Sequence, residues 1–242
     1  MKRDYEKEYH NVEDRNWWFT SRRNYIIGLL KDHDKSSKVL DIGCSSGVLL
    51  NDLHAIGFDK QKLYGIDISE AAIANCKKNG IENSFVMDAQ NISLNEKFDI
   101  LIASDCLEHL ENDTAALDNW YSLLNEGGQL YVFVPAFMSL WSPHDVANMH
   151  YRRYTRGELY NKVIKANFKV LKSGYWNFFL FTPVFVYRKI NNVLNNNKQA
   201  EGDIVHSGII NSILKKLISF ENFLLKSVRF PFGISTFCIV KK

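Results

Sequence analysis

The chain of 242 residues carries a formal net charge of +3, which is too small to favour nucleic acid as a partner. Apolar residues make up 46% and charged residues 24%, the balance of a globular protein, and the length suits one large α/β domain. The four cysteines show no C-x-x-C spacing, so neither a zinc site nor any other metal site nor a disulfide framework is expected. The polar N-terminus and the absence of a membrane-length apolar run predict a cytoplasmic protein.

Strand-like and helix-like segments alternate from residue 38 to about 176. The strands are nearly continuously apolar, which predicts a parallel sheet covered by helices on both faces, an α/β fold. Residues 125–128 predict a helix stop and a turn, and Thr155 with Glu158 predicts a capping box that opens a helix over 156–166. The predicted strands are 38–42, 62–67, 84–87, 98–103, 128–134, 168–175 and 235–240, and the other predicted helices are 47–56, 69–79 and 113–125.

The turn after the first strand is the most informative segment, because residues 39–47 read Val-Leu-Asp-Ile-Gly-Cys-Ser-Ser-Gly. Small residues stand at its first, third and fifth places, Gly43, Ser45 and Gly47. A dinucleotide fingerprint needs glycine at the first, third and sixth places, and this chain has Ser45 and Val48 at the last two. The turn, with Asp41 before it, resembles motif I of the class I S-adenosylmethionine-dependent methyltransferases. Glycine usually stands where this chain has Ser45, which needs a negative φ or a tolerated strain.

This resemblance implies a Rossmann-like, doubly wound sheet of seven strands in the order 3-2-1-4-5-7-6, with the last strand antiparallel and a helical insertion before it. It covers residues 38–176 and 234–242, which we expect to form the S-adenosylmethionine-binding domain. Residues 1–37 are then an N-terminal helical lid segment. The helical insertion, 177–233, is a substrate cap or an interface.

The same resemblance places the cofactor. Asp67 would accept hydrogen bonds from both ribose hydroxyls, and Ile68 would pack on the adenine. Asp88 would meet the adenine amino group, or would cap a turn instead. The Leu-Glu-His run at 107–109 matches the family after the fourth strand, where the motifs of DNA methyltransferases are missing. The residues implied to bind S-adenosylmethionine are Asp41, Gly43, Cys44, Ser45, Gly47, Asp67, Ile68, Asp88, Ala89, Ser104 and Leu107.

An aromatic run, Trp-Trp-Phe at 17–19, precedes Arg22 and Arg23. It resembles an N-terminal segment of the small-molecule and glycan-associated methyltransferases of types 11 and 12. Such aromatics could close a lid over the cofactor, with Trp18 as a substrate contact, and the arginines could bind an anionic substrate group or the cofactor carboxylate. In the alternative, the tryptophans anchor the helix to the sheet and the arginines are surface charge.

The connection after the fifth strand, residues 135–155, carries two histidines, an aspartate, two arginines and several aromatics. Long connections inside compact domains are usually functional or disordered, and the resemblance assigns this one to the substrate. Because a hydroxyl acceptor needs a base, we expect His144, next to Asp145, as the first candidate. The full set of predicted catalytic residues is His144, Asp145, His150 and His109, and the predicted substrate-binding residues are Trp18, Arg22, Arg23, Trp141, Arg152 and Arg153.

Together these features predict an S-adenosylmethionine-dependent methyltransferase that forms S-adenosylhomocysteine as product. We expect O-methylation of a small-molecule or of a lipid- or glycan-linked acceptor, and no nucleic acid. Within the insertion, residues 177–229 are aromatic, helical in spacing and partly basic, so they could cover the acceptor, pair with a second copy in a homodimer, or contact the inner face of a membrane. The alternative functions are a non-catalytic S-adenosylmethionine-binding regulatory or assembly protein and, less in keeping with the sequence, an RNA or protein methyltransferase.

Overall fold

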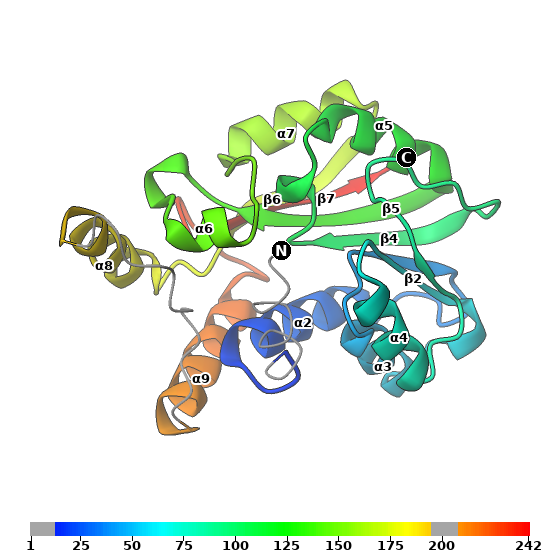
Figure 1. The fold of residues 1–242 in the computed structure, drawn as a ribbon, viewed down its shortest axis with the longest axis horizontal. Coiled ribbons are helices and arrows are strands. Elements are labelled where there is room, and N and C mark those ends of the chain that lie inside the picture. Colours follow the sequence, from blue (N-terminus) through cyan, green and yellow to red (C-terminus); the bar gives the residue numbers. More distant parts are fainter. Residues whose placement is uncertain (1–12, 195–207) are drawn as a thin grey trace.

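The computed structural model describes residues 13–194 and 208–242, which form a seven-stranded sheet covered by helices (Figure 1). The strand order is β3-β2-β1-β4-β5-β7-β6, and β7 runs antiparallel to both of its neighbours whereas the other pairs are parallel. The fold class and the strand order predicted from the resemblance are therefore confirmed. The strands are β1 (Val39–Ile42), β2 (Leu63–Asp67), β3 (Ser84–Val86), β4 (Phe98–Ser104), β5 (Leu124–Pro135), β6 (Lys169–Trp176) and β7 (Ser235–Lys241).

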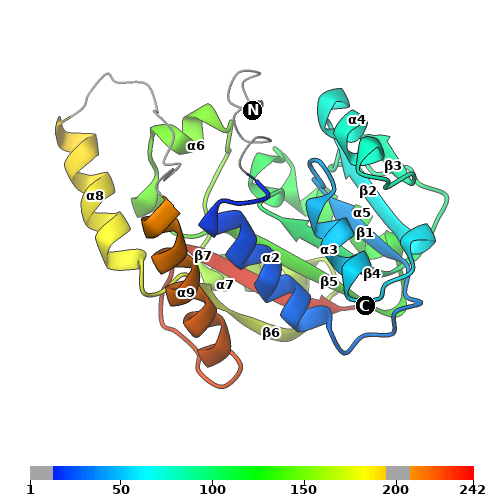
Figure 2. The same ribbon diagram turned by 90° about the horizontal axis from the view of Figure 1, so that it is seen from below.

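Helices cover both faces of the sheet. The helices α5 and α7 lie on one face, and α2, α3, α4 and α9 lie on the other (Figure 2). The buried side chains of each group pack against the face that they cover. Within the two described ranges, no helix is both long enough and apolar enough to cross a membrane. The helices are α2 (Trp17–Leu30), α3 (Val48–Ala55), α4 (Glu70–Lys78), α5 (Asp113–Leu123), α6 (Pro143–Ala147), α7 (Arg156–Lys165), α8 (Phe181–Leu194) and α9 (Gly208–Leu224), with short 3-10 turns η1 (Lys60–Lys62), η2 (Leu107–His109) and η3 (Met138–Leu140).

The sheet divides the core into two layers because side chains alternate along each strand. On β5, Leu130, Val132 and Val134 face the layer under α5 and α7. Tyr131 and Phe133 face the layer under α2 and α3. The nearly continuous apolar character of the central strands follows from this arrangement, since both faces of each strand are buried.

The structure departs from the sequence prediction at two places. β5 begins at Leu124 and not at 128, because the predicted turn over 125–128 lies within the strand, where the register with β4 is irregular. The long connection after β5 contains a helix, α6, that the sequence did not predict. The capping box of Thr155 and Glu158 is confirmed at the start of α7.

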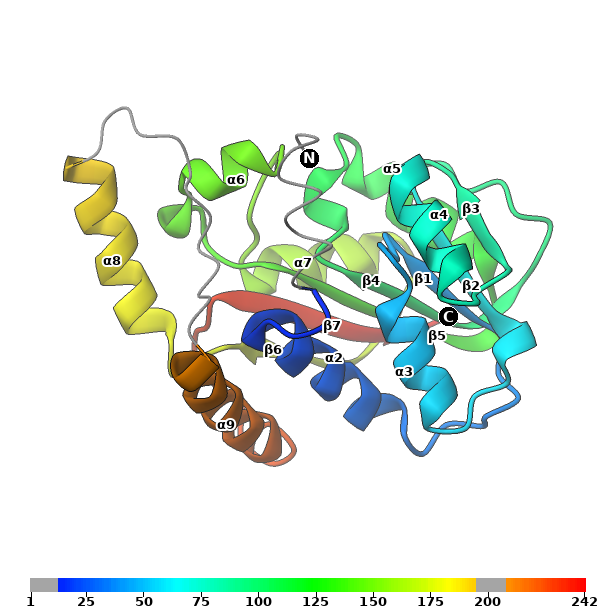
Figure 3. The ribbon, with the colours of Figure 1, turned by 60° about the horizontal axis from the view of Figure 1, so that its bottom comes forward.

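Hydrogen bonds to one buried carboxylate, that of Glu221 on α9, connect the insertion to the end of β6. It accepts hydrogen bonds from three successive backbone amides at 177–179, directly after β6. α9 also lies along α2, where the Trp17 amide donates to Asn211 Oδ1 at 2.7 Å (Figure 3). The insertion therefore packs on the N-terminal helix as well as on the sheet.

We predict that Glu221→Ala destabilises the protein strongly, because it leaves three amides without their acceptor. Each buried unsatisfied amide costs about 1–3 kcal/mol, so the expected loss is roughly 3 kcal/mol or more. For a chain of this size, that corresponds to a fall in melting temperature of roughly 6–12 °C. Thermal unfolding followed by circular dichroism measures it. The exposed Lys216→Ala on the same helix serves as the control, and similar small shifts in both variants would contradict the prediction.

Candidate active site

The turn between β1 and α3 is built from residues with positive φ, namely Gly43 at 79°, Ser45 at 49° and Gly47 at 76°. A Cβ at Gly43 would lie 3.3 Å from the Cβ and Sγ atoms of Cys106. A Cβ at Gly47 would lie 2.5 Å from the Sγ of Cys76. Both glycines are therefore required by the backbone conformation and by close packing against the end of β4 and against α4.

Ser45 occupies the strained conformation that the sequence left open. Its amide donates to Asp67 Oδ2 at 3.0 Å, and its hydroxyl donates to Glu13 at 2.7 Å. Glu13 also accepts a hydrogen bond from the Ser46 hydroxyl. A left-handed conformation costs a non-glycine residue roughly 1–2 kcal/mol, and these hydrogen bonds offset it at about 0.5–1.5 kcal/mol each. Glu13 was not predicted as a site residue, because its contact joins positions 32 residues apart that share no motif.

The end of β2 presents a carboxylate and an apolar surface side by side. Asp67 Oδ1 accepts the Ser69 amide at 2.9 Å, which fixes the carboxylate at the start of α4. The adjoining Ile68 is 76% exposed, so its side chain is available to a flat aromatic base. Asp88, which is exposed, accepts the Gln90 amide at 2.8 Å, the turn-capping geometry that the sequence offered as the alternative.

Four other predicted cofactor contacts lie in different surroundings. Cys44 and Ser104 line the pocket described below. The side chain of Leu107 is fully buried in the core under α5, so its predicted direct contact with the cofactor is corrected. Ala89 is partly buried, and its carbonyl accepts a hydrogen bond from Trp120 Nε1 at 2.8 Å.

A pocket opens beside the turn, and its walls carry charges of both signs. Arg22 and Arg23 come from α2, Asp41 and Asp105 come from the ends of β1 and β4, and Glu13 comes from the segment before α2. The methionine end of S-adenosylmethionine carries an ammonium, a carboxylate and a sulfonium, so a mixed set of charges fits it. The remaining lining residues are Phe19, Ile26, Gly43, Cys44, Ser45, Val48, Leu49 and Ser104.

Asp41 is a lining carboxyl group with a strongly perturbed pKa. Burial first, and then the nearby Cys76, Asp67 and Glu13, raise its pKa to about 8. A buried carboxyl group among other acids is stabilised by a proton or by a bound cation. The ammonium group of the methionine moiety supplies such a cation, so the donor set of this pocket fits the cofactor.

Arg22 is buried, so the alternative that it is surface charge is wrong. Its Nη1 lies 3.4 Å from Asp105, its Nη2 donates to the Ser235 hydroxyl at 2.8 Å, and its guanidinium carbon lies 4.3 Å from the centre of the Trp176 ring. Trp18 packs edge-on against the same Trp176 with ring centres 5.1 Å apart. This contact corresponds to the anchoring alternative, since Trp18 ties α2 to β6.

The connection after β5 is ordered around the buried carboxylate of Asp145. Arg153 donates to it through Nε at 2.7 Å and Nη2 at 3.0 Å, and the Ser142 amide donates at 2.9 Å. His150 Nδ1 lies 2.9 Å from Asp145 Oδ1. Burial alone would raise the pKa of Asp145, but the hydrogen bonds from His150 and Arg153 hold it well below its ordinary value. Asp145 is therefore an acceptor, His150 Nδ1 donates, and His150 Nε2 is left with its lone pair.

This geometry changes the order of the candidate histidines. Asp145 orients His150 and not the adjacent His144, which the sequence favoured. The ring of His109 lies 4.6 Å from that of His150, whereas the ring of His144 lies 6.5 Å from it. Burial, followed by the effect of His150, lowers the pKa of His109 to about 3, so this imidazole is neutral. Glu108, fully buried, adjoins the pair.

Three arginines that were predicted to bind substrate form ion pairs with carboxylates of the protein. Arg153 is held by Asp145, and Arg152 lies 2.9 Å from Asp113 at the start of α5. This engagement argues against the predicted role of both as acceptor ligands. Arg23 donates at 2.8 Å to a carboxylate of α3 while also lining the pocket. Trp141 is half-buried directly after η3.

Comparison with known proteins shows the family of this chain. Residues 20–173 match the sequence family described as "Methyltransferase domain". The chain belongs to this methyltransferase family. The chain therefore carries an S-adenosylmethionine-dependent methyltransferase domain with the Rossmann-like fold. The residues predicted to hold the donor stay a prediction, which the geometry of the pocket supports.

Curated relatives share only part of their length with this chain. A putative methyltransferase of Invertebrate iridescent virus 6 is 29% identical over 115 residues, which are 47% of this chain and 42% of the relative. A ubiquinone biosynthesis O-methyltransferase of Rickettsia canadensis is 30% identical over 96 residues, which are 38% of this chain and 41% of the relative. This chain thus matches about two-fifths of the length of these relatives.

Solved structures of low sequence identity show the same fold over nearly the whole chain. A methyltransferase of Thermotoga maritima, described as a possible histamine N-methyltransferase, has a TM-score of 0.62 at 16% identity and covers 99% of this chain and 95% of its own. The putative methyltransferase solved with the Trm112 activator of Haloferax volcanii has a TM-score of 0.64 at 14% identity, covering 98% and 94%.

We predict that Asp67→Ala weakens the binding of S-adenosylmethionine roughly 10- to 100-fold. The variant removes a carboxylate that is placed to accept the ribose hydroxyls, and such charged hydrogen bonds contribute about 1.5–3 kcal/mol. Isothermal titration calorimetry measures the dissociation constant. The control is Glu82→Gln, an exposed acid between α4 and β3, which should bind normally. A dissociation constant of Asp67→Ala within about twofold of the unmodified chain would contradict the assignment.

Proposed function

We propose that this methyltransferase acts on an oxygen atom of a small-molecule acceptor, including acceptors linked to a lipid or a glycan. The observation that carries the proposal is the position of the Asp145–His150 pair. The Tyr151 amide donates to the Glu108 carbonyl at 2.8 Å, which ties this pair to the segment that follows β4. That segment begins with Asp105, which lines the cofactor pocket. The imidazole is therefore held at the border of the methyl donor's site.

The chemistry needs little from the protein apart from alignment. Methyl transfer is an in-line displacement at a sulfonium carbon that is already activated by its positive charge, so the site must orient the acceptor and exclude water. A hydroxyl acceptor must also lose its proton, whereas a carboxylate or a preformed phenolate need not. We assign the activation of the hydroxyl to Nε2 of His150, which Asp145 holds in the required tautomer.

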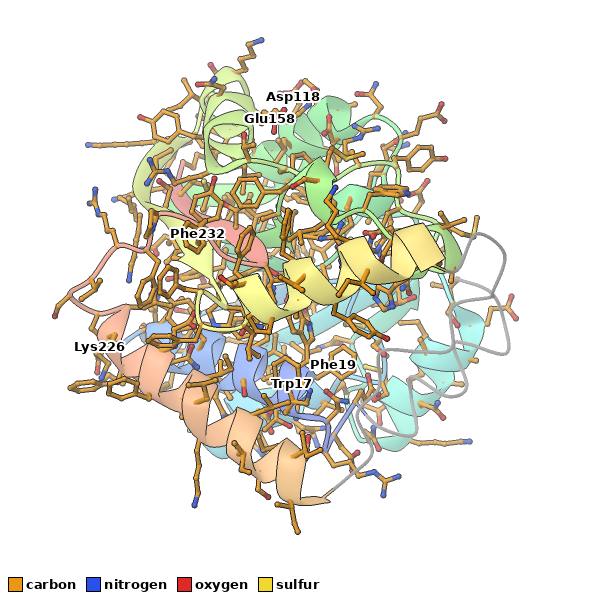
Figure 4. All side chains as sticks on the ribbon, turned by 90° about the vertical axis from the view of Figure 1, so that its left-hand side faces the viewer. Trp17, Phe19, Asp118, Glu158, Lys226 and Phe232 are labelled. Atoms are coloured by element: carbon orange, nitrogen blue, oxygen red, sulfur yellow. The ribbon has the colours of Figure 1, made fainter. Side chains whose placement is uncertain are left out.

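The start of α8 supports an apolar acceptor. Phe181 contacts Phe137 and Phe232 with ring centres 5.7 Å and 4.8 Å apart, and Figure 4 shows Phe232 beside the first turn of this helix. Arg188 of α8 donates to the Leu140 carbonyl at 2.7 Å, so the helix lies over the connection after β5. These contacts support the substrate-cap role of 177–233. The ubiquinone biosynthesis O-methyltransferases among the relatives support an oxygen acceptor.

Two other functions fit less well. A non-catalytic S-adenosylmethionine-binding protein would have no use for a buried His-Asp pair beside the pocket. The second is an RNA or protein methyltransferase. The near-neutral charge of this chain speaks against RNA.

We predict that His150→Ala lowers methyl-transfer turnover by roughly 10²- to 10⁴-fold, the usual contribution of a positioned acid or base. The affinity for S-adenosylmethionine should stay unchanged, because His150 does not line its pocket. Release of S-adenosylhomocysteine, measured with phenolic and polyprenyl-linked hydroxyl acceptors, gives the turnover, and mass spectrometry of the product gives the methylated atom.

His144→Ala is the matched comparison, because it removes an imidazole six residues away on the same connection. It should lower turnover by less than about tenfold. A larger loss in His144→Ala than in His150→Ala would restore the order expected from the sequence. A product methylated on nitrogen or carbon would contradict the proposal of O-methylation.

A lipid-linked acceptor would require the protein to approach a membrane, and α9 carries a suitable surface. Its exposed side chains Ile209, Ile213, Lys216, Phe220 and Phe223 follow helical spacing along one face. Apolar residues interspersed with lysine are typical of helices that lie in the interface of an anionic membrane.

We predict that the protein floats with vesicles containing phosphatidylglycerol at low salt and not with phosphatidylcholine vesicles. Replacement of Phe220 and Phe223 by serine should reduce the floated fraction, because both are more than half exposed on α9. Tyr160→Ser on α7, also exposed, is the control. Absence of flotation at low salt would remove the membrane contact and leave the O-methyltransferase proposal in place.

A further inference from the structure

Glu108, His109 and His150 bring three metal-ligating groups together. Each offers one oxygen or nitrogen atom, and these atoms lie within 4.8 Å of one another. Glu108 and His109 are neighbours in η2, while His150 comes from the connection after β5, held by the hydrogen bond of Tyr151 to the backbone of Glu108. The cluster uses no cysteine, which is why cysteine spacing did not reveal it.

Glu108 is a buried carboxyl group that lacks a counterpart. Its side chain is 0% exposed, and neither of its oxygens has a hydrogen-bond partner within the described ranges. A buried polar group without a partner is costly, and two such oxygens in a native fold indicate that something outside the protein chain satisfies them.

The imidazole of His150 is oriented by a carboxylate. Its Nδ1 lies 2.9 Å from Asp145 Oδ1. Metal-bound histidines almost always show this arrangement, in which the other ring nitrogen donates to a carboxylate or to a carbonyl. The ring of His109 lies 4.6 Å from that of His150, so the two imidazoles stand side by side next to Glu108.

We propose that Glu108, His109 and His150 bind a divalent transition-metal ion of the Zn²⁺ type, in a site with an open position. Two imidazoles and one carboxylate are a ligand set of catalytic metal sites. The ligand atoms of a tetrahedral Zn²⁺ lie about 3.4 Å apart. The distances between the ligand atoms of this cluster would therefore have to shorten by less than about 1.5 Å, which small rotations of the side chains can provide. The ion would also give Glu108 its missing partner.

The role of this ion rests on the proposed function. An acceptor hydroxyl bound at the open position would release its proton to solvent, because the metal lowers the pKa of a bound oxygen. The oxygen would then form a bond to the methyl carbon, and the carbon–sulfur bond would break with its electron pair retained by sulfur. The products are the methyl ether and S-adenosylhomocysteine. His150 would thus act on the hydroxyl through the metal.

The test is a titration of the full chain, freed of metal by a chelator, with Co²⁺ followed by visible absorption. We expect one equivalent to bind with the absorption bands of a low-coordinate site, and one equivalent of Zn²⁺ to displace it. His109→Ala and Glu108→Gln should each weaken binding by at least about 100-fold. His54→Ala on α3 removes a histidine outside the cluster and should bind normally. Circular dichroism and S-adenosylmethionine binding verify that every variant is folded.

A folded chain that binds S-adenosylmethionine but takes up no Co²⁺ at millimolar concentration would overturn the proposal. Binding that survives both His109→Ala and Glu108→Gln would overturn the assignment of the ligands. X-ray absorption at the cobalt edge should show nitrogen and oxygen ligands with imidazole scattering, and sulfur ligation would contradict the site. Because the titration contains no acceptor, a bound metal without O-methylation would count against the proposed function alone.

Discussion

The structure of the connection after β5, where we propose that the acceptor binds, depends on the neutralisation of one buried carboxylate. Asp145 is fully buried, and an isolated carboxylate there would be strongly unfavourable. A two-point contact with Arg153, the imidazole of His150 and the Ser142 amide satisfy it. Since these partners come from both ends of the connection after β5, satisfying the charge also fixes the path of that connection. The position of the His150 ring is a consequence of this constraint.

Buried carboxyl groups that need a compensating charge also occur at the S-adenosylmethionine pocket. Asp41 and Asp105 line the pocket, and Glu108 is buried close behind Asp105. Carboxyl groups gathered in this way favour bound cations, and S-adenosylmethionine brings a sulfonium and an ammonium. Transfer of the methyl group removes the sulfonium charge, so this field favours the donor over the product. The positive charge of Arg22, which is buried among aromatic rings beside Asp105, offsets part of this negative charge.

Features that depend on local sequence patterns were predicted, whereas contacts between residues that are brought together only by the fold were not. Apolar periodicity was sufficient for the strands, whereas their order and the cofactor followed from the resemblance of the Gly43–Gly47 turn and of residues 107–109 to a known family. The turn expected at 125–128 was overridden because strand pairing with β4 outweighed its local preference. Asp145 stood beside His144 in sequence, yet the fold of α6 directs its carboxylate to His150, five residues on. Glu13 could not be found because its contacts with the turn arise only from the packing of the N-terminal segment.

The central claim is that the donor pocket and the Glu108–His109–His150 cluster are two parts of one active site. A crystal structure of the complex with S-adenosylhomocysteine tests it most directly. We expect the ribose to bind Asp67 and the amino-acid end to lie between Asp41 and Arg22. The sulfur should lie near Asp105 and face His150. A sulfur directed away from His150, toward another surface of the molecule, would contradict it.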